Sequence, residues 1–248
     1  MKKFPNVMPI NDTELLTRIK ESLEDADEIP RRILTAQIPL LGLEPSSSLY
    51  QETIYYYDNP GRRKDLASKQ SGCGLFTEYG WLAAGVTDNR LKIPVDTRSS
   101  EGGLLYPITL EIDIAEKMGA IRWKDGDSQE SFDPQQGDAL IIGCKSCPGI
   151  WAKNTYTVEH EFTIALVDLS YAAASFMTIH SFDGGQPGIA VRTRSVVFGP
   201  GNEVWLANTD ENGFYEIDSD RRPVKGRRVL KCINVTKLQC INTPNGLL

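Results

Sequence analysis

The sequence predicts an α+β fold, with helices in its first half and a largely antiparallel sheet in its second half. Apolar residues recur at helical spacing in three segments, at 12–23, 75–83 and 108–118. Strand-like apolar runs then follow one another, at 137–143, 161–168, 175–182 and 189–198. Helices followed by a run of neighbouring strands are typical of an antiparallel sheet with helices packed against it.

The chain is long enough for one main domain with elaborations at its ends, because 248 residues can bury a single sizeable core. Asn11 or Asp12 caps the first helix, and a loop rich in serine follows at 43–48. We therefore predict a helical N-terminal extension over residues 1–48 and a main domain over residues 49–248. The main domain ends in a C-terminal β elaboration, for which there are two weaker strand candidates, 202–208 and 228–235.

Composition and charge argue against several classes of function. The net charge is −6, so the chain shows no electrostatic footprint for nucleic acid. No apolar run reaches the length of a membrane span. The N-terminus has two lysines but no apolar segment of a secretory signal. We expect the chain to be made in the cytoplasm and to reach the periplasm or a target cell by a non-Sec route.

The five cysteines do not form a complete disulfide framework, because their number is odd and no secretory signal is visible. Cys144 and Cys147 are spaced as in a zinc or redox motif. A zinc site would also need Cys232 and Cys240, which are spaced more widely than in a zinc knuckle. A redox motif needs a strand-to-helix context, whereas Cys147 precedes a proline. We predict a local disulfide or packed thiols, and no metal.

Cys73 is the candidate nucleophile, in the stretch "SKQSGCGLFTEYGWLAAG" at 68–85. It lies between Gly72 and Gly74 at the start of a predicted helix, where the helix dipole and free N–H groups favour a thiolate. The two glycines also let a substrate approach the backbone closely. The alternative is a small cysteine that packs beside a glycine turn.

A cysteine nucleophile needs a base, and the chain has only two histidines. His160 begins a predicted strand and shares the parity of Phe162 and Ile164. It therefore lies on the more apolar face of that strand, against which we expect the cysteine helix to pack. The alternative is a histidine that simply ends a strand.

These motifs in this order resemble the papain-like peptidoglycan hydrolases of the NlpC and CHAP types. The resemblance rests on Cys73 at a helix start, "PQQGDALII" at 134–142, and His160 at the start of the next strand. It covers residues 50–200, although NlpC-type enzymes have Asp-Cys-Ser-Gly where this chain has Ser-Gly-Cys-Gly. The resemblance implies a papain-like fold, with the nucleophile-bearing helix packed on the sheet, and catalysis by cysteine and histidine without a cofactor.

The resemblance also implies a third polar residue that orients the imidazole. His180 matches the NlpC-type position, and Asp183 matches the CHAP-type position. We favour Asp183 slightly, although an Asp-Gly hairpin turn explains it equally well. The backbone N–H of Cys73 and the side chain of Gln70 are candidates for the oxyanion hole, with a surface role for Gln70 as the alternative.

The function predicted from the sequence is hydrolysis of amide bonds in the peptide stems of peptidoglycan. An antibacterial effector of this kind would be delivered by a contractile injection or phage-lysis route and would need an immunity protein in its producer. Two alternatives stay open. One is a cysteine toxin that cleaves or deamidates a host protein, and the other is a non-catalytic binding module on the same scaffold.

Overall fold

The computed structural model describes most of the chain in separate ranges. These are residues 2–3, 12–44, 47–50, 52, 72–88, 91, 106–144, 157–168, 172–180, 188–208 and 214–238. All structural findings refer to these residues.

The three helices that apolar spacing predicts are present, and a fourth long helix lies between the first two. The longer ones are α1 (Asp12–Ser22), α2 (Glu28–Gln37), α5 (Gly72–Ala83) and α7 (Tyr106–Lys117). The short helical turns are η1 (Ile38–Leu40), α3 (Ser48–Tyr50), η6 (Gln129–Ser131), η8 (Pro200–Asn202) and η9 (Val235–Lys237). Gly85 and Gly119 follow α5 and α7 with positive φ, as expected for helix ends. Within the described ranges, no helix combines the length and apolarity that crossing a bilayer requires.

The strands of the main sheet also occur where their composition predicts them, with one addition. They are β2 (Ile121–Lys124), β3 (Ala139–Cys144), β4 (Thr157–Asp168), β5 (Ala173–His180), β6 (Gly188–Phe198), β7 (Val204–Ala207) and β9 (Gly226–Ile233). A separate two-stranded sheet pairs β1 (Lys2–Lys3) with β8 (Phe214–Tyr215). The segment that forms β2 carries too few residues to give a clear strand pattern.

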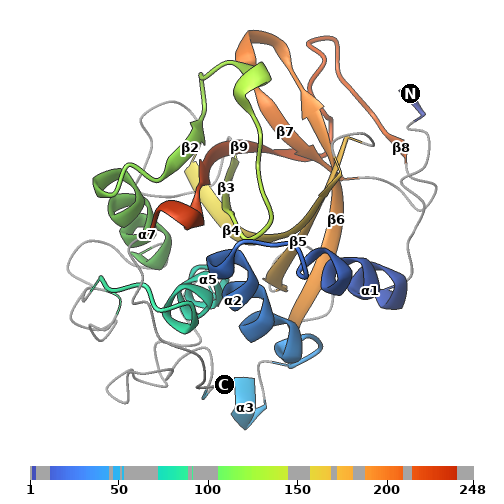
Figure 1. Ribbon diagram of the computed structural model, residues 1–248. Coiled ribbons are helices and arrows are strands. Elements are labelled where there is room, and N and C mark those ends of the chain that lie inside the picture. The colour runs from blue at the N-terminus through green and yellow to red at the C-terminus, as the bar shows by residue number, and fades with distance from the viewer. Residues whose placement is uncertain are drawn as a thin grey trace.

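The main sheet closes on itself. Its strands follow the order β2-β9-β3-β4-β5-β6-β7, all neighbours are antiparallel, and β9 also pairs with β7 (Figure 1). The predicted papain-like fold, with a helix packed on an open sheet, is therefore wrong. The chain forms a closed six-stranded antiparallel β-barrel, which removes the exposed strand edges that an open sheet would leave.

Strand β9 closes the barrel because its two halves have different partners on one edge. Gly226–Arg228 pair with β7, whereas Lys231–Ile233 pair with β2. The other edge of β9 pairs with β3 between Arg228 and Ile233. The last strand of the chain thus joins the two ends of the sheet.

Partly buried ion pairs stabilise the seam of the barrel, which is the junction between β7 and β9. Glu203, which is 6% exposed, accepts hydrogen bonds from Arg222 at 2.6 and 2.9 Å and from Arg228 at 2.9 Å. Arg228 also donates to Asp125 at 2.7 and 3.0 Å. Burial raises the Glu203 pKa, but the hydrogen bonds from Arg222 and Trp205 and the charge of Arg228 outweigh burial, so the net shift is downward.

Two layers of core lie on opposite faces of the barrel wall. The interior holds apolar side chains from all six barrel strands, including Leu140, Ile142, Phe162, Ile164, Ala174, Phe176, Val196, Val204, Leu206 and Val229. The outer face of β3, β4, β5, β6 and β9 packs against the helices. Figure 1 shows α2 and α5 side by side against this outer face, with α7 next to them.

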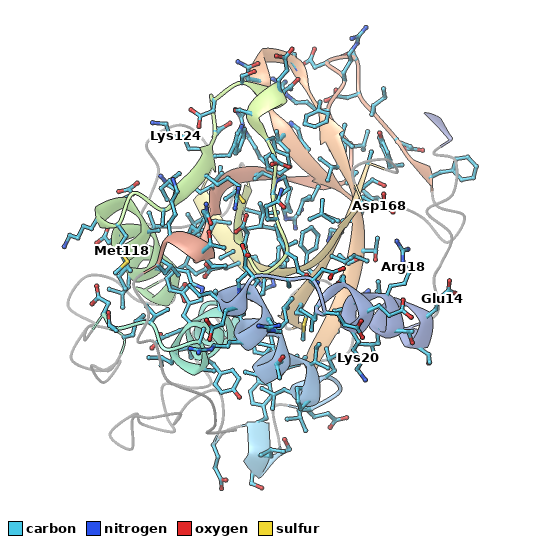
Figure 2. The ribbon with its side chains drawn as sticks, viewed as in Figure 1. Glu14, Arg18, Lys20, Met118, Lys124 and Asp168 are labelled. Carbon is cyan, nitrogen blue, oxygen red and sulfur yellow. The ribbon has the colours of Figure 1, made fainter. Side chains whose placement is uncertain are left out.

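Helix α1 rests on the barrel through apolar contacts and one surface ion pair. Leu15, Ile19 and Leu23 join Ala165 and Met177 in the outer core. Arg18 donates to Asp168, at the end of β4, over 3.3 Å (Figure 2). Both partners are partly exposed, so the apolar contacts hold α1 in place more than the ion pair does.

Candidate active site

Cys73 is the second residue of α5, in the first turn of the helix. It is 4% exposed and belongs to the core between α5, α7 and the outer face of the barrel. The Thr77 hydroxyl donates to the Cys73 carbonyl oxygen over 3.3 Å. The predicted position of the thiol at a helix N-terminus is therefore present in the structure.

A buried glutamine fixes α5 against the barrel. The Gln37 side chain, from the end of α2, donates to the Phe76 carbonyl at 3.1 Å and to the Thr163 hydroxyl at 3.0 Å. Gly80 leaves room for it, since a Cβ there would lie 2.7 Å from Gln37 Nε2. This contact joins α2, α5 and β4, and so positions the first half of α5 over β4.

Three glutamates meet in this core. Glu78 on α5, Glu111 on α7 and Glu161 on β4 are each 0% exposed. Among the residues that the structure describes, none donates a hydrogen bond to either carboxyl oxygen of Glu111 or Glu161 when the two groups are ionised. Buried carboxylates without donors cost free energy. Packing of the core therefore does not explain why carboxyl groups occupy these buried positions.

The pKa values of Glu111 and Glu161 are both raised. Their side chains are within hydrogen-bonding distance once one of them is protonated. Burial, followed by the charge of Glu161, raises the Glu111 pKa well above its usual value of 4.5. Burial, opposed by the hydrogen bond with Glu111, raises the Glu161 pKa to about 8. Both shifts favour the protonated, uncharged form of the carboxyl group.

Cys73 and His160 both lie within electrostatic range of this pair. The charge of Cys73 raises the pKa values of Glu111 and Glu161. The charge of His160 lowers the Glu161 pKa. The structure thus brings a thiol and three carboxyls together at the contact of α5, α7 and β4.

The face of β4 that carries His160 is not the face that the helices cover, contrary to the prediction from the sequence. Its ring lies 4.7 Å from that of Phe162, and its Nδ1 accepts the Glu161 backbone N–H at 3.1 Å. Phe162 points into the barrel, whereas the helices cover the opposite face. The parity argument was therefore wrong about which face carries the cysteine helix, because closure turned the more apolar face inward. The role of His160 as the base stays a prediction.

Of the other predicted site residues, the structure describes only His180. His180 ends β5 and pairs with Gly188 through its backbone. Asp183 and Gln70 lie outside the described residues, so their proposed roles stay predictions.

The Gly-Asp motif has a structural role. Asp138 accepts hydrogen bonds from Arg122 Nε at 2.6 Å, from the Gln135 backbone at 2.9 Å and from the Val235 backbone at 3.3 Å. Gly137 has φ +85°, and a Cβ there would lie 2.7 Å from the Pro30 Cα. The motif thus ties the start of β3 to β2, to η9 and to α2.

The part of the chain that the structure describes contains no group of three or more histidine, cysteine or carboxylate side chains arranged to hold a metal ion. Cys232 is fully buried in the barrel and donates to Asp138 over 3.6 Å. Burial, followed by the charge of Asp138, raises the Cys232 pKa. Cys147 and Cys240 lie outside the described residues, so the cysteine-pair predictions are untested.

Sequence reasoning missed the three buried glutamates, although a signal was present for one of them. Glu111 interrupts the apolar residues of a helix between Leu110 and Ile112, whereas Glu161 lies between His160 and Phe162 and carries no such signal. A charged residue at a position that periodicity assigns to the core is a candidate functional group.

In comparisons with known proteins, no family model, curated protein or solved structure matches this chain. A functional assignment must therefore come from the chemistry of the site and the order of the motifs.

Proposed function

We propose that this chain is a cysteine-dependent hydrolase of amide bonds, with Cys73 as its nucleophile. The observation that carries the proposal is the placement of Cys73 in the first turn of α5, in a core that also contains the buried carboxyl groups of Glu111 and Glu161. Ionisable groups with strongly shifted pKa values, gathered around a nucleophile, are typical of catalytic sites.

The reaction proceeds by acyl transfer. The Cys73 thiol gives its proton to His160, and the thiolate sulfur attacks the carbonyl carbon of the amide. The C–N bond breaks, and His160 returns the proton to the departing amine. Water then adds to the thioester, releasing a carboxylic acid and restoring the thiol. Either Asp183 or His180 orients the imidazole, and the Cys73 N–H, with Gln70, stabilises the oxyanion.

The substrate class that we propose is the peptide stem of peptidoglycan. Its support is the ordered set of Cys73, the Gly137–Asp138 turn and His160 along the sequence. The turn leads into β3, whose Ile142 pairs with His160 on β4. Activity on the cell wall requires export, and a producer would need an immunity protein; both belong to this proposal.

The test is digestion of purified sacculi and soluble muropeptides, with products identified by mass spectrometry. Wild type should release new amino termini from the stems, and Cys73→Ser should not. Cys232→Ser is the matched control, because it changes a cysteine inside the barrel, away from the proposed reaction. Products that persist in Cys73→Ser would refute the nucleophile. If no muropeptide is cut, but Cys73-dependent cleavage or deamidation of host proteins occurs, the substrate class is wrong and the mechanism survives.

A further inference from the structure

A polar pocket lies where the turn between α1 and α2 meets β2, η9 and the loop before β3. Its volume is about 330 Å³, near the lower end of the range of about 300–1,000 Å³ for pockets that hold small molecules. All of its lining residues except Ala26 and Pro30 are polar. Neither Cys73 nor His160 lines it, so it is a separate candidate for a binding site.

A buried carboxylate holds Arg122 in place at this pocket. Arg122 Nε donates to Asp138, whose side chain is 1% exposed, at 2.6 Å. Within the part of the chain that the structure describes, no residue accepts a hydrogen bond from the two Nη atoms of Arg122. Neither Nη atom is a buried atom that lacks a partner, so both contact solvent, and Arg122 lines the pocket. The paired donors at the end of a guanidinium match the two oxygens of a carboxylate.

The loop before β3 fixes the walls of the pocket. Gln136 donates to the Ser22 hydroxyl at 2.6 Å and to the Ala165 carbonyl at 2.8 Å, which ties the end of α1 to β4. Gly137 lies so close to Pro30 that an added Cβ would be 2.6 Å from the Pro30 Cβ. Because Gln136, Ser22 and Pro30 all line the pocket, its walls are set by the fold before a ligand binds, and this lowers the entropy cost of binding.

Two carboxylates on the turn between α1 and α2 carry the opposite charge to Arg122. Asp25 and Asp27 are exposed and line the pocket. Asp27 precedes α2 but its side chain does not cap the helix, and neither carboxylate is hydrogen-bonded or ion-paired to another described residue. Because the charge of Asp138 offsets that of Arg122, these two carboxylates leave the pocket negative. A negative pocket disfavours phosphate or another simple anion.

We propose that this pocket binds a small zwitterion, a molecule that carries both a carboxylate and an ammonium group, as free amino acids and short peptides do. The Nη atoms of Arg122 bind the carboxylate, and Asp25 and Asp27 attract the ammonium group. A ligand with both charges satisfies the unused guanidinium donors and also offsets the negative rim. The site binds and does not react, so this proposal goes beyond the hydrolase activity and does not rest on it.

Ligand-observed NMR with the full chain tests the class of ligand. Pools of free amino acids and pools of dipeptides are screened separately, which distinguishes these two sources of the same chemistry. At least one zwitterion should bind. Its C-terminal amide, which lacks the carboxylate, should bind at least about tenfold more weakly, and its N-acetylated form, which lacks the ammonium charge, at least about threefold more weakly. A screen without a binder would overturn the proposal, as would a blocked form or inorganic phosphate that binds as tightly as the zwitterion.

Variants test whether the ligand occupies this pocket. Asp25→Asn combined with Asp27→Asn removes two exposed charges, so the fold should persist while the affinity falls several-fold. Glu24→Gln is the matched control, because Glu24 is an exposed carboxylate of the same turn that does not line the pocket. Arg122→Lys keeps a positive charge beside Asp138 but loses the paired donors, so affinity should fall about tenfold. Unchanged affinity in the double variant, or an equal loss in Glu24→Gln, would overturn the proposal, and neither readout depends on hydrolysis.

Discussion

Replacing Glu161 by glutamine should stabilise the protein in alkaline solution. Glutamine matches the shape of a protonated glutamate and carries no ionisable proton. The folded protein holds the Glu161 proton up to a pH of about 8, whereas an unfolded glutamate loses it near its usual pKa of 4.5. Between these values the folded state binds more protons than the unfolded state, so stability must fall as the pH rises.

The magnitude follows from the width of that window. Each pKa unit corresponds to about 1.4 kcal/mol, so a shift from 4.5 to about 8 sets an upper limit of about 5 kcal/mol on the stability lost. The contribution of Glu161 is fully present below pH 4.5 and is gone above its folded pKa. Glu161→Gln should therefore equal wild type in acid and exceed it in alkali by a few kcal/mol.

Urea unfolding at about pH 5 and about pH 9 measures this difference, because the free energy of unfolding can be compared between variants at each pH. Wild type should lose much more stability between the two conditions than Glu161→Gln. Glu116→Gln, which removes a carboxylate that is 52% exposed, should behave like wild type. Equal losses in wild type and Glu161→Gln would show that Glu161 does not titrate in the folded protein as the buried pair requires.

Three further outcomes follow from the structure. Iodoacetamide should alkylate Cys73 before Cys232, because Cys232 is fully buried in the barrel and its pKa is raised; peptide mapping checks the order, and the reverse order would contradict it. Gly137→Ala should lower the free energy of unfolding by about 2 kcal/mol or more, since a Cβ meets the Pro30 backbone at positive φ; an unchanged urea midpoint would refute this. Glu203→Ala should lower the free energy of unfolding by about 3 kcal/mol near neutral pH, and this difference from wild type should shrink as acid protonates Glu203. A difference that stays constant down to acid pH would count against the seam ion pairs.

The positions of most helices and strands could be predicted from the sequence, because each element depends mainly on residues close to it along the chain. The apolar spacing of Leu15 and Ile19 places α1, and the positive φ of Gly85 and Gly119 ends α5 and α7 as predicted. Strands β3 to β7 begin and end close to the predicted residues. Apolar spacing and helix-ending glycines lie within or directly beside the element that they predict.

The closure of the sheet into a barrel could not be predicted from the sequence. It depends on β9, which is among the last strands and had a weak pattern, pairing with both β3 and β7. Alternation along one strand does not reveal which strand lies at its other edge. The same closure sent Phe162 into the barrel and turned Glu161 toward the helices, so the error in fold class produced the error about His160.

The corrected orientation also changes the meaning of the motifs. The Gly137–Asp138 turn supported the hydrolase prediction, yet the structure explains it as a tie between strands and α2. The Glu111–Glu161 pair supported no prediction, yet it has no structural benefit that an apolar pair could not supply. An inert scaffold should therefore tolerate apolar replacement of the pair and be stabilised by it.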